Sequence, residues 1–90
     1  MKILAVCGMG LGSGLLLRMQ AEKALKQLGI EADLEVADIG TARALASSAD
    51  LIITSDELAA QLGQVKPKIV TITNFIDLQE MVTKLGAALA

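Results

Sequence analysis

The residues best suited to chemistry lie together in Cys7–Gly14, which reads CGMGLGSG. This segment holds the only cysteine of the 90-residue chain and four of its eight glycines. Glycines let successive backbone N–H groups converge into a concave nest that binds an oxyanion. A helix starting near Ser13 would add the partial positive charge of its N-terminus. We therefore expect Cys7 to be a nucleophile, shifted toward the thiolate, at the head of an anion-binding loop.

Three familiar motifs do not fit this segment. The dinucleotide fingerprint G-x-G-x-x-G would need a glycine where Ser13 or Leu15 stands. A nucleotide P-loop needs Gly-Lys-Ser/Thr, and no lysine lies between Lys2 and Lys23. The C-x5-R signature of cysteine-dependent phosphatases would need arginine at Ser13, so a phosphatase would lack its bidentate phosphate clamp. The segment favours a site that carries a phosphoryl group over one that hydrolyses it.

Other interpretations of the cysteine stay open. A weak cysteine-dependent phosphatase and a non-catalytic anion-binding or regulatory module of the same fold are the alternatives. A lone cysteine is also often a small buried hydrophobic residue. Its place at the end of an apolar run and directly before four glycines favours a functional thiol.

The composition argues against several classes of protein. The chain has no histidine, which removes Ser-His and Cys-His nucleophile pairs and the common zinc sites, so we expect no metal and no cofactor. Its formal net charge is −2, and Phe75 is the single aromatic residue, so neither a basic footprint nor a stacking platform supports nucleic-acid binding. One cysteine forms no internal disulfide, which is typical of a reducing, cytoplasmic location. The uncharged segment 3–17 is too short for a membrane span, which takes roughly 20 residues.

Short apolar runs alternate with helical patterns along the whole chain, in the order βαβαβαβα. The expected strands are 2–6, 32–38, 50–54 and 67–73, and the expected helices are 13–29, 41–47, 54–63 and 77–90. The expected helix caps are Ser13, Gly29 and Gly63, with capping boxes at Thr54–Glu57 and Asp77–Glu80. The inward stripe of the first helix is expected to hold Leu16, Leu17, Met19, Ala21, Ala24, Leu25 and Leu28. That of the last helix is expected to hold Leu78, Met81, Val82, Leu85 and Leu89.

This alternation predicts a single α/β domain over residues 1–90, a flavodoxin-like three-layer sandwich with helices on both faces of a four-stranded parallel sheet. We expect the strand order 2-1-3-4. The second strand alternates, with Leu34 and Val36 against Asp33 and Glu35, and the fourth begins at Pro67, so both suit sheet edges. Ligands of open α/β sheets bind beyond the carboxyl ends of the strands, where the strand order reverses. That position lies between strands one and three.

Two loops border this crevice. The loop after the first strand begins at Cys7, and the segment after the third begins Thr54, Ser55, Asp56. These three polar residues either contact phosphate or cap the following helix, and the sequence leaves both open. Asp38, which ends the second expected strand, is expected to be a turn residue.

The N-terminal segment KILAVCGMGLGSGLLLRM (2–19) resembles the start of the IIB components of the bacterial sugar phosphotransferase system (PTS), with the ascorbate type closest. The later segment ADLIITSDELA (49–59) and the last helix extend the resemblance over the whole chain as one IIB domain. The resemblance implies an enzyme, a protein-N(π)-phosphohistidine–sugar phosphotransferase. In it Cys7 accepts phosphate from a phosphohistidine of the IIA partner. The phosphocysteine then gives it to a sugar bound in the membrane component IIC.

The resemblance also implies that the phosphate loop is formed by Gly8, Met9, Gly10, Leu11, Gly12 and Ser13. Gly14 departs from relatives that have a second serine there, which puts the stiffness of the loop in doubt. The missing histidine would be supplied by IIA. Apolar Met9, Leu11 and Leu15 would suit a docking face, with core packing as the other interpretation. The sequence determines neither which sugar is transported nor the oligomeric state.

Overall fold

The structure is a computed structural model that describes residues 1–7 and 11–89, and of residues 11–14 it describes the backbone. Strands and helices alternate as the sequence predicts, with one additional turn of 3₁₀ helix. The elements are β1 (Lys2–Val6), α1 (Leu11–Leu28), β2 (Asp33–Ala37), α2 (Ile39–Leu45), η1 (Ala46–Ser48), β3 (Leu51–Thr54), α3 (Asp56–Leu62), β4 (Lys68–Thr71) and α4 (Leu78–Leu89).

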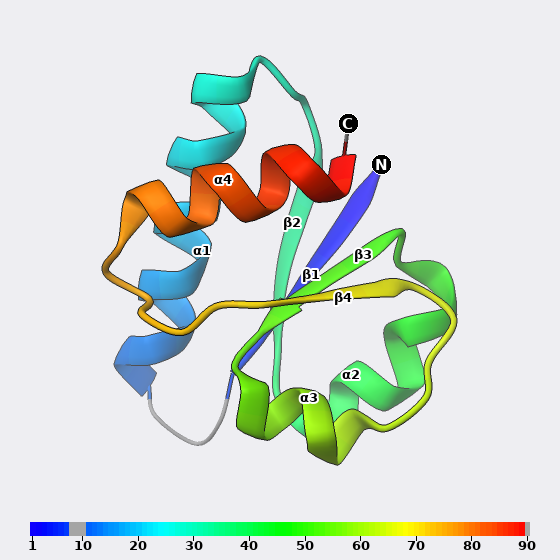
Figure 1. Ribbon diagram of the computed structural model, residues 1–90. Coiled ribbons are helices and arrows are strands. Elements are labelled where there is room, and N and C mark those ends of the chain that lie inside the picture. Colours follow the sequence, from blue (N-terminus) through cyan, green and yellow to red (C-terminus); the bar gives the residue numbers. More distant parts are fainter. Residues whose placement is uncertain (8–10, 90) are drawn as a thin grey trace.

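The four strands form one parallel sheet in the order β2-β1-β3-β4 (Figure 1). This confirms the flavodoxin-like α/β fold, with β1 and β3 central and β2 and β4 at the edges. Parallel strands need crossover connections, and each connection here contains a helix. The order reverses between β1 and β3, since β1 leads outward to β2 while β3 leads outward to β4.

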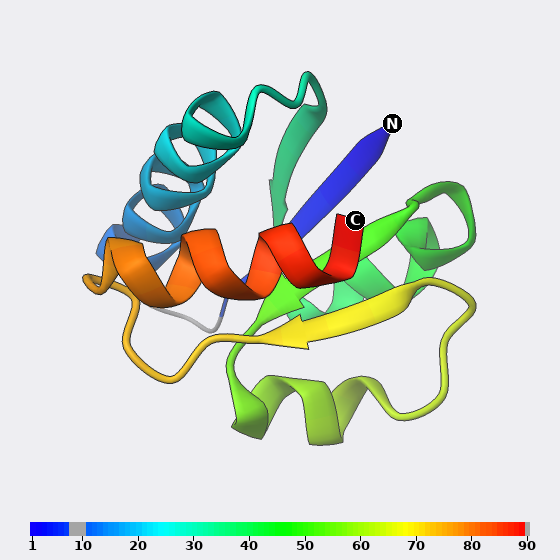
Figure 2. The same cartoon turned by 45° about the horizontal axis from the view of Figure 1, so that its top comes forward.

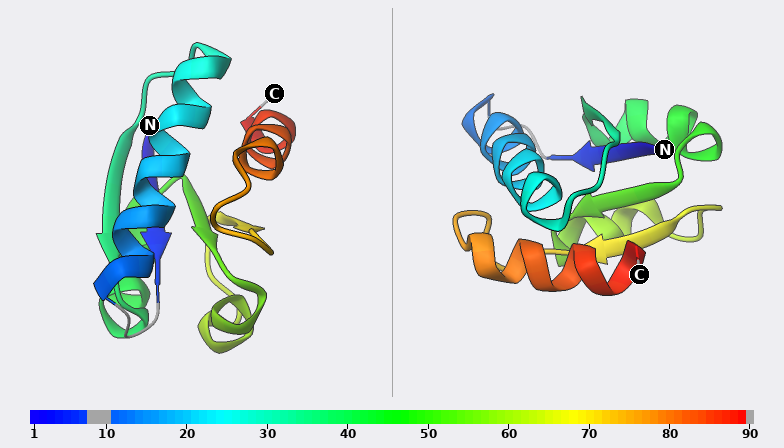
Figure 3. Two further views of the ribbon diagram at one scale, coloured as in Figure 1. Left: turned by 90° about the vertical axis from the view of Figure 1, so that its left-hand side faces the viewer. Right: turned by 90° about the horizontal axis from the view of Figure 1, so that it is seen from above.

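Helices cover both faces of the sheet, and each face has its own hydrophobic core (Figures 2 and 3). α1 and α4 pack against each other on one face, and α2 and α3 lie on the other. Side chains of β1 alternate between the cores, because successive residues of a strand point to opposite faces. Ile3, Ala5 and Cys7 join the core under α1 and α4, while Leu4 and Val6 join the other.

The long helix α1 begins at Leu11, two residues before the expected start at Ser13. Its end is the expected one. Gly29 adopts φ 71°, a left-handed conformation that favours glycine. The Ile30 N–H donates to the Leu25 carbonyl at 2.9 Å and the Gly29 N–H to the Lys26 carbonyl at 3.2 Å, which is the bond pattern of a Schellman cap.

The expected inward stripe of α1 is confirmed at five of its seven positions, since Leu28 packs against the core with the four buried residues named next, while Leu16 is half-buried and joins neither core. Leu17, Ala21, Ala24 and Leu25 are buried, whereas Met19 is 52% exposed. At 100° per residue Met19 lies about 200° around the helix from Leu17, on the outer face. The residues expected to face inward on α1 span a wider arc of the helix than the core covers.

The last helix carries its expected stripe, with Met81 and Leu85 fully buried and Leu78, Val82 and Leu89 packed against the same core. The edge strand β2 departs from expectation at one position. Leu34 packs against the core under α1, but Val36 is exposed near the end of the strand. A strand at the edge of a sheet is covered less completely than a central one, so the alternation does not bury every apolar residue.

Candidate functional site

Cys7 is the first residue after β1, at the carboxyl end of the sheet. Its side chain is only 4% exposed and packs in the core under α1 and α4. Its N–H donates to the Ala37 carbonyl at the end of β2, at 3.1 Å. The single thiol therefore lies beside the switch point of the sheet, as the topology predicted.

Burial raises the pKa of the Cys7 thiol. This is opposite to the expected shift toward the thiolate. Desolvation disfavours the charged form of any acid, and here it is the only cause of the shift. The structure therefore disfavours the thiolate form of Cys7.

The expected phosphate loop is described in part. Gly8, Met9 and Gly10 lie outside the described residues. The backbone of Leu11, Gly12 and Ser13 forms the first turn of α1, and Gly14 continues that helix. The N-terminus of an 18-residue helix thus begins four positions after the thiol. Which of the residues from Gly8 to Ser13 bind phosphate stays a prediction.

Thr54 ends β3 and is completely buried. Its hydroxyl donates to the Val6 carbonyl at 2.8 Å, and its own carbonyl accepts from the Ile72 N–H at 2.8 Å. The expected capping box of Thr54 with Glu57 is wrong, because the hydroxyl of Thr54 is used across the sheet.

The residue that caps α3 is Ser55, whose hydroxyl accepts from the Leu58 N–H at 3.3 Å. Asp56 is exposed in the first turn of α3, where its charge suits the helix N-terminus. Of the two interpretations left open for this segment, helix capping holds for Ser55.

Asp38 plays the same part after β2. Its carboxylate accepts from the Thr41 N–H at 2.7 Å and caps α2, rather than standing in a simple turn. The hydrogen bonds from Thr41 lower the pKa of Asp38. Two of the helices that follow strands, α2 and α3, are thus capped at the carboxyl end of the sheet, where Cys7 also lies.

Two apolar side chains stand out on the outer face of α1. Leu15 is 62% exposed and Met19 is 52% exposed, one helical turn apart. For Leu15 this decides against core packing. Leu11 and Met9, the other two candidates for a docking face, have no described side chains. Ile76, in the loop between β4 and α4, is also exposed, and the sequence analysis did not single it out.

A carboxylate clamp on the β4–α4 loop escaped the sequence analysis. Glu80 accepts from the N–H groups of Thr73 and Asn74 at 2.7 and 2.9 Å. Lys84 donates to Glu80 and to the Thr71 carbonyl, both at 2.6 Å. These contacts, with Lys84 the largest cause, lower the pKa of Glu80 to about 2. The expected capping box is only half formed, since Asp77 accepts from the Glu80 N–H at 3.2 Å while the Glu80 carboxylate binds elsewhere.

The i,i+4 spacing of Glu80 and Lys84 was the available signal for this clamp. It fastens the segment that leaves β4 at the same end of the sheet as Cys7. The clamp therefore lies at the end of the sheet that carries Cys7, on a segment far from Cys7 in the sequence.

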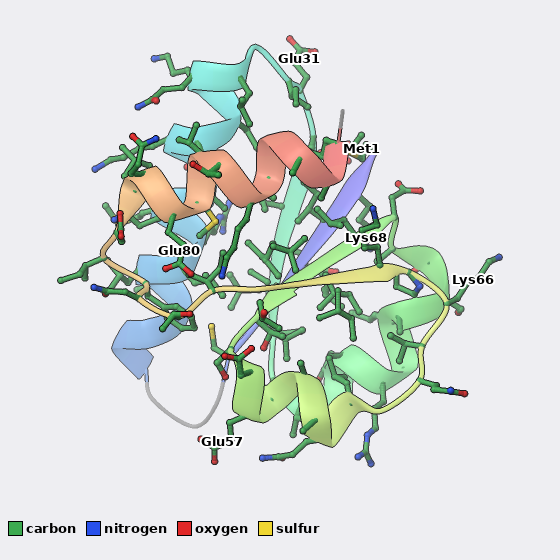
Figure 4. All side chains as sticks on the ribbon, viewed as in Figure 1. Met1, Glu31, Glu57, Lys66, Lys68 and Glu80 are labelled. Carbon is green, nitrogen blue, oxygen red and sulfur yellow. The ribbon has the colours of Figure 1, made fainter. Side chains whose placement is uncertain are left out.

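A broad open hollow lies at the opposite end of the sheet. It has a volume of about 770 Å³, and its lining includes Met1, Leu25, Ile30 and Asp33. Met1 precedes β1 and Asp33 begins β2, so the hollow is at the amino ends of the strands, away from Cys7. Figure 4 labels Met1 and Glu31 there.

Within residues 1–7 and 11–89, no three His, Cys, Asp or Glu side chains gather as a metal site. In the same part of the chain, no helix is long and apolar enough to cross a membrane.

Comparisons with known proteins agree on one family. The family described as PTS system, Lactose/Cellobiose specific IIB subunit, matches residues 2–86. The chain is 35% identical over 88 residues to the ascorbate-specific PTS system EIIB component of Mycoplasma pneumoniae, covering 97% of this chain and 93% of that relative. It is 36% identical over 61 residues to the ascorbate-specific EIIB component of Shigella sonnei, covering 68% of this chain and 60% of that relative.

A solved structure has the same fold. It is the lactose-specific IIB component domain of the phosphoenolpyruvate:carbohydrate phosphotransferase system from Streptococcus pneumoniae, with a TM-score of 0.61. The match covers 99% of this chain and 94% of that one at 18% identity, so it speaks for the fold alone.

Proposed function

Because the chain belongs to the lactose/cellobiose-specific IIB subunit family of the phosphotransferase system, we propose that it is a phosphoryl carrier that works through Cys7. The phosphoryl group comes from a phosphohistidine of a IIA protein and passes to a sugar bound in the membrane component IIC. The observation that carries the proposal is the position of the thiol. The only cysteine directly follows β1 at the switch point of the sheet, and α1 begins at Leu11.

The absence of histidine from the chain fits a reaction in which the imidazole is the partner's. In the first step the N–P bond of the phosphohistidine breaks and an S–P bond forms on Cys7. The proton of the Cys7 thiol goes to the imidazole nitrogen that leaves. In the second step the S–P bond breaks, an O–P bond forms on a sugar hydroxyl, and the hydroxyl proton returns to the sulfur.

We assign the phosphate loop to Gly8, Met9, Gly10, Leu11, Gly12 and Ser13. The N–H groups of the first helical turn of α1 have no partners within the helix and carry partial positive charge. They suit the non-bridging oxygens of a phosphoryl group on sulfur, and they stabilise charge on those oxygens during transfer.

The sugar that we propose is ascorbate. Both curated relatives described above are ascorbate-specific, and one of them aligns over nearly the whole chain. The lactose-specific structure is too distant in sequence to argue for its own sugar. We place the chain in the cytoplasm, in contact with the membrane only through IIC.

Docking of IIA is assigned to the outer face of the first half of α1. Leu15 and Met19 expose apolar side chains there, close along the chain to the proposed phosphate loop. Apolar side chains that contribute little to the core suit the buried centre of a transient interface.

The test is phosphoryl transfer in a reconstituted relay of phosphoenolpyruvate, the general phosphotransferase proteins and an ascorbate-type IIA. Intact mass spectrometry would detect the adduct on this chain. We expect a phosphoryl adduct that depends on IIA and is absent from Cys7→Ser. A folded wild-type chain with a reactive thiol and no adduct would overturn the proposal and favour an anion-binding module. Steady hydrolysis of an aryl phosphate without IIA would favour a phosphatase.

A further inference from the structure

Thr54 is a polar residue in β3, whose other residues are apolar and buried. It is completely buried at the end of β3, and its hydroxyl donates to the Val6 carbonyl at 2.8 Å across 48 positions of sequence. A buried hydroxyl needs a partner, and this one finds it on the strand that leads to Cys7.

The hydrogen bond continues the sheet where backbone pairing stops. The register of β1 and β3 ends at the pair Ala5 and Ile53. The backbone carbonyl of Thr54 faces the other way, toward β4, where it accepts from the Ile72 N–H. The chain then turns into α3, and the hydroxyl of Thr54 binds the last carbonyl of β1.

The bond acts on the peptide unit that joins Val6 to Cys7. The carbonyl of this unit accepts from Thr54 on the β3 side, at 2.8 Å. Its N–H belongs to Cys7 and donates to the Ala37 carbonyl on the β2 side, at 3.1 Å. Both ends of one planar group are therefore held, one by each neighbouring strand.

We propose that Thr54 is a positioning residue for Cys7. By holding this peptide unit it fixes where the Cα of Cys7 leaves the sheet and keeps the sulfur aligned for in-line transfer. The inference rests on the proposed function for its effect on transfer. Its effect on the thiol itself is independent of that function. Small displacements of a reacting group cost much of the rate, because catalysis depends on near-attack geometry.

The test compares Thr54→Val, which keeps the shape and removes the hydroxyl, with Thr54→Ser, which keeps the hydroxyl. Thr71→Val is the matched control, because Thr71 is the register partner of Thr54 on β4 and is partly exposed. Two quantities are measured on folded protein well below the melting temperature. One is the rate of Cys7 alkylation by iodoacetamide, and the other is single-turnover transfer from phosphorylated IIA.

We expect Thr54→Val to lower the transfer rate at saturating IIA at least tenfold while the half-saturating IIA concentration stays unchanged. Alkylation of Cys7 should become severalfold faster, since the thiol is no longer held in the core. Thr54→Ser and Thr71→Val should resemble the wild type in both measurements. A residue important for stability alone would lower the melting temperature and leave both native-state rates unchanged.

Wild-type rates in Thr54→Val, or equal losses in Thr54→Val and Thr54→Ser, would overturn the inference. If Thr54→Val does not fold, Thr54→Ala is compared with Thr54→Ser, a pair that differs by the hydroxyl alone. If no variant accepts phosphate, including the wild type, the proposed function fails. Alkylation then still decides whether Thr54 positions the thiol.

Discussion

Replacing Glu80 by glutamine removes one charge from the loop that leaves β4 and leaves the shape of the side chain nearly unchanged. The carboxylate accepts three hydrogen bonds, from the N–H groups of Thr73 and Asn74 and from the ammonium group of Lys84. The side chain of Glu80 is 15% exposed and that of Lys84 is 37% exposed. Glutamine can keep part of this pattern through its carbonyl oxygen, but only with neutral hydrogen bonds.

The expected loss of stability follows from the difference between charged and neutral bonds. Hydrogen bonds to charged groups contribute ~1.5–3 kcal/mol and neutral ones ~0.5–1.5 kcal/mol. The two backbone bonds go to different oxygens of the carboxylate. The carbonyl oxygen of glutamine keeps one of them as a neutral bond, at a loss of ~1 kcal/mol, whereas the amide nitrogen accepts no hydrogen bond, so the other is lost at ~1.5–3 kcal/mol. The bond to Lys84 contributes less because solvent screens it. We expect Glu80→Gln to lower the free energy of unfolding by about 3 kcal/mol. For a chain of this length this lowers the melting temperature by roughly 12–24 °C.

The same contacts predict a pH dependence. In the folded chain the pKa of Glu80 is lowered to about 2 from an ordinary value of 4.5. A lowered folded-state pKa gives stability that is fully present above the unfolded-state pKa. Its contribution should therefore be constant above about pH 4.5 and should fall as the pH drops from 4.5 toward 2. Glu80→Gln should lack this part of the acid destabilisation.

Urea unfolding followed by circular dichroism, from pH 7 down to pH 2, checks both effects. Glu31→Gln is the control, because Glu31 is an exposed carboxylate in the loop before β2. If Glu80→Gln and Glu31→Gln give the same unfolding midpoints across this range, the clamp contributes nothing to stability and the reasoning is wrong.

Three further predictions concern helices. Gly86→Ala should stabilise the chain by about 0.5–1 kcal/mol in urea unfolding, because a new Cβ in α4 meets Leu28 Cδ2 at an ordinary 3.4 Å. A lower midpoint would show that the contact between α1 and α4 is too tight for a methyl group. Gly29→Ala should destabilise it by about 1 kcal/mol, since φ is 71° there, and an unchanged midpoint would contradict this conformation. The double variant Leu15→Gln/Met19→Gln should raise the half-saturating IIA concentration roughly tenfold, a loss of about 1.4 kcal/mol, at an unchanged melting temperature. An unchanged IIA dependence would place docking elsewhere.

The strand order could be predicted because the pattern of apolar residues in a strand shows how many of its faces are buried. The continuous apolar runs of β1 and β3 indicate strands covered on both faces, and the structure places them at the centre. Alternation in β2 and Pro67 before β4 indicate edges, and both strands are edges. The sequence pattern predicted helix starts less well where more than one residue could begin the helix. Ser13 is a good cap by residue type, yet α1 begins at Leu11.

The position of the thiol could also be predicted, but the direction of its pKa shift could not. Strand order and the end of β1 follow from sequence patterns, and they place Cys7 at the switch point. The pKa depends on how deeply the sulfur is packed. Glycines suggested an open loop, whereas alternation along β1 turns Cys7 into the core with Ile3 and Ala5, and burial raises its pKa.

The segment from Thr54 to Leu58 shows why the support of the site escaped prediction. Two adjacent hydroxyl residues stand before a short helix, and either could cap it. Local spacing favours Thr54 with Glu57, because that pair forms the capping box. Which hydroxyl caps the helix is determined by the Val6 carbonyl, 48 positions before Thr54. This carbonyl lies where the β1–β3 pairing ends. Since a buried carbonyl must find a donor, it takes the hydroxyl of Thr54 and leaves the cap to Ser55. A polar residue that ends a fully buried strand is therefore better tested first against the neighbouring strand than against the helix that follows it.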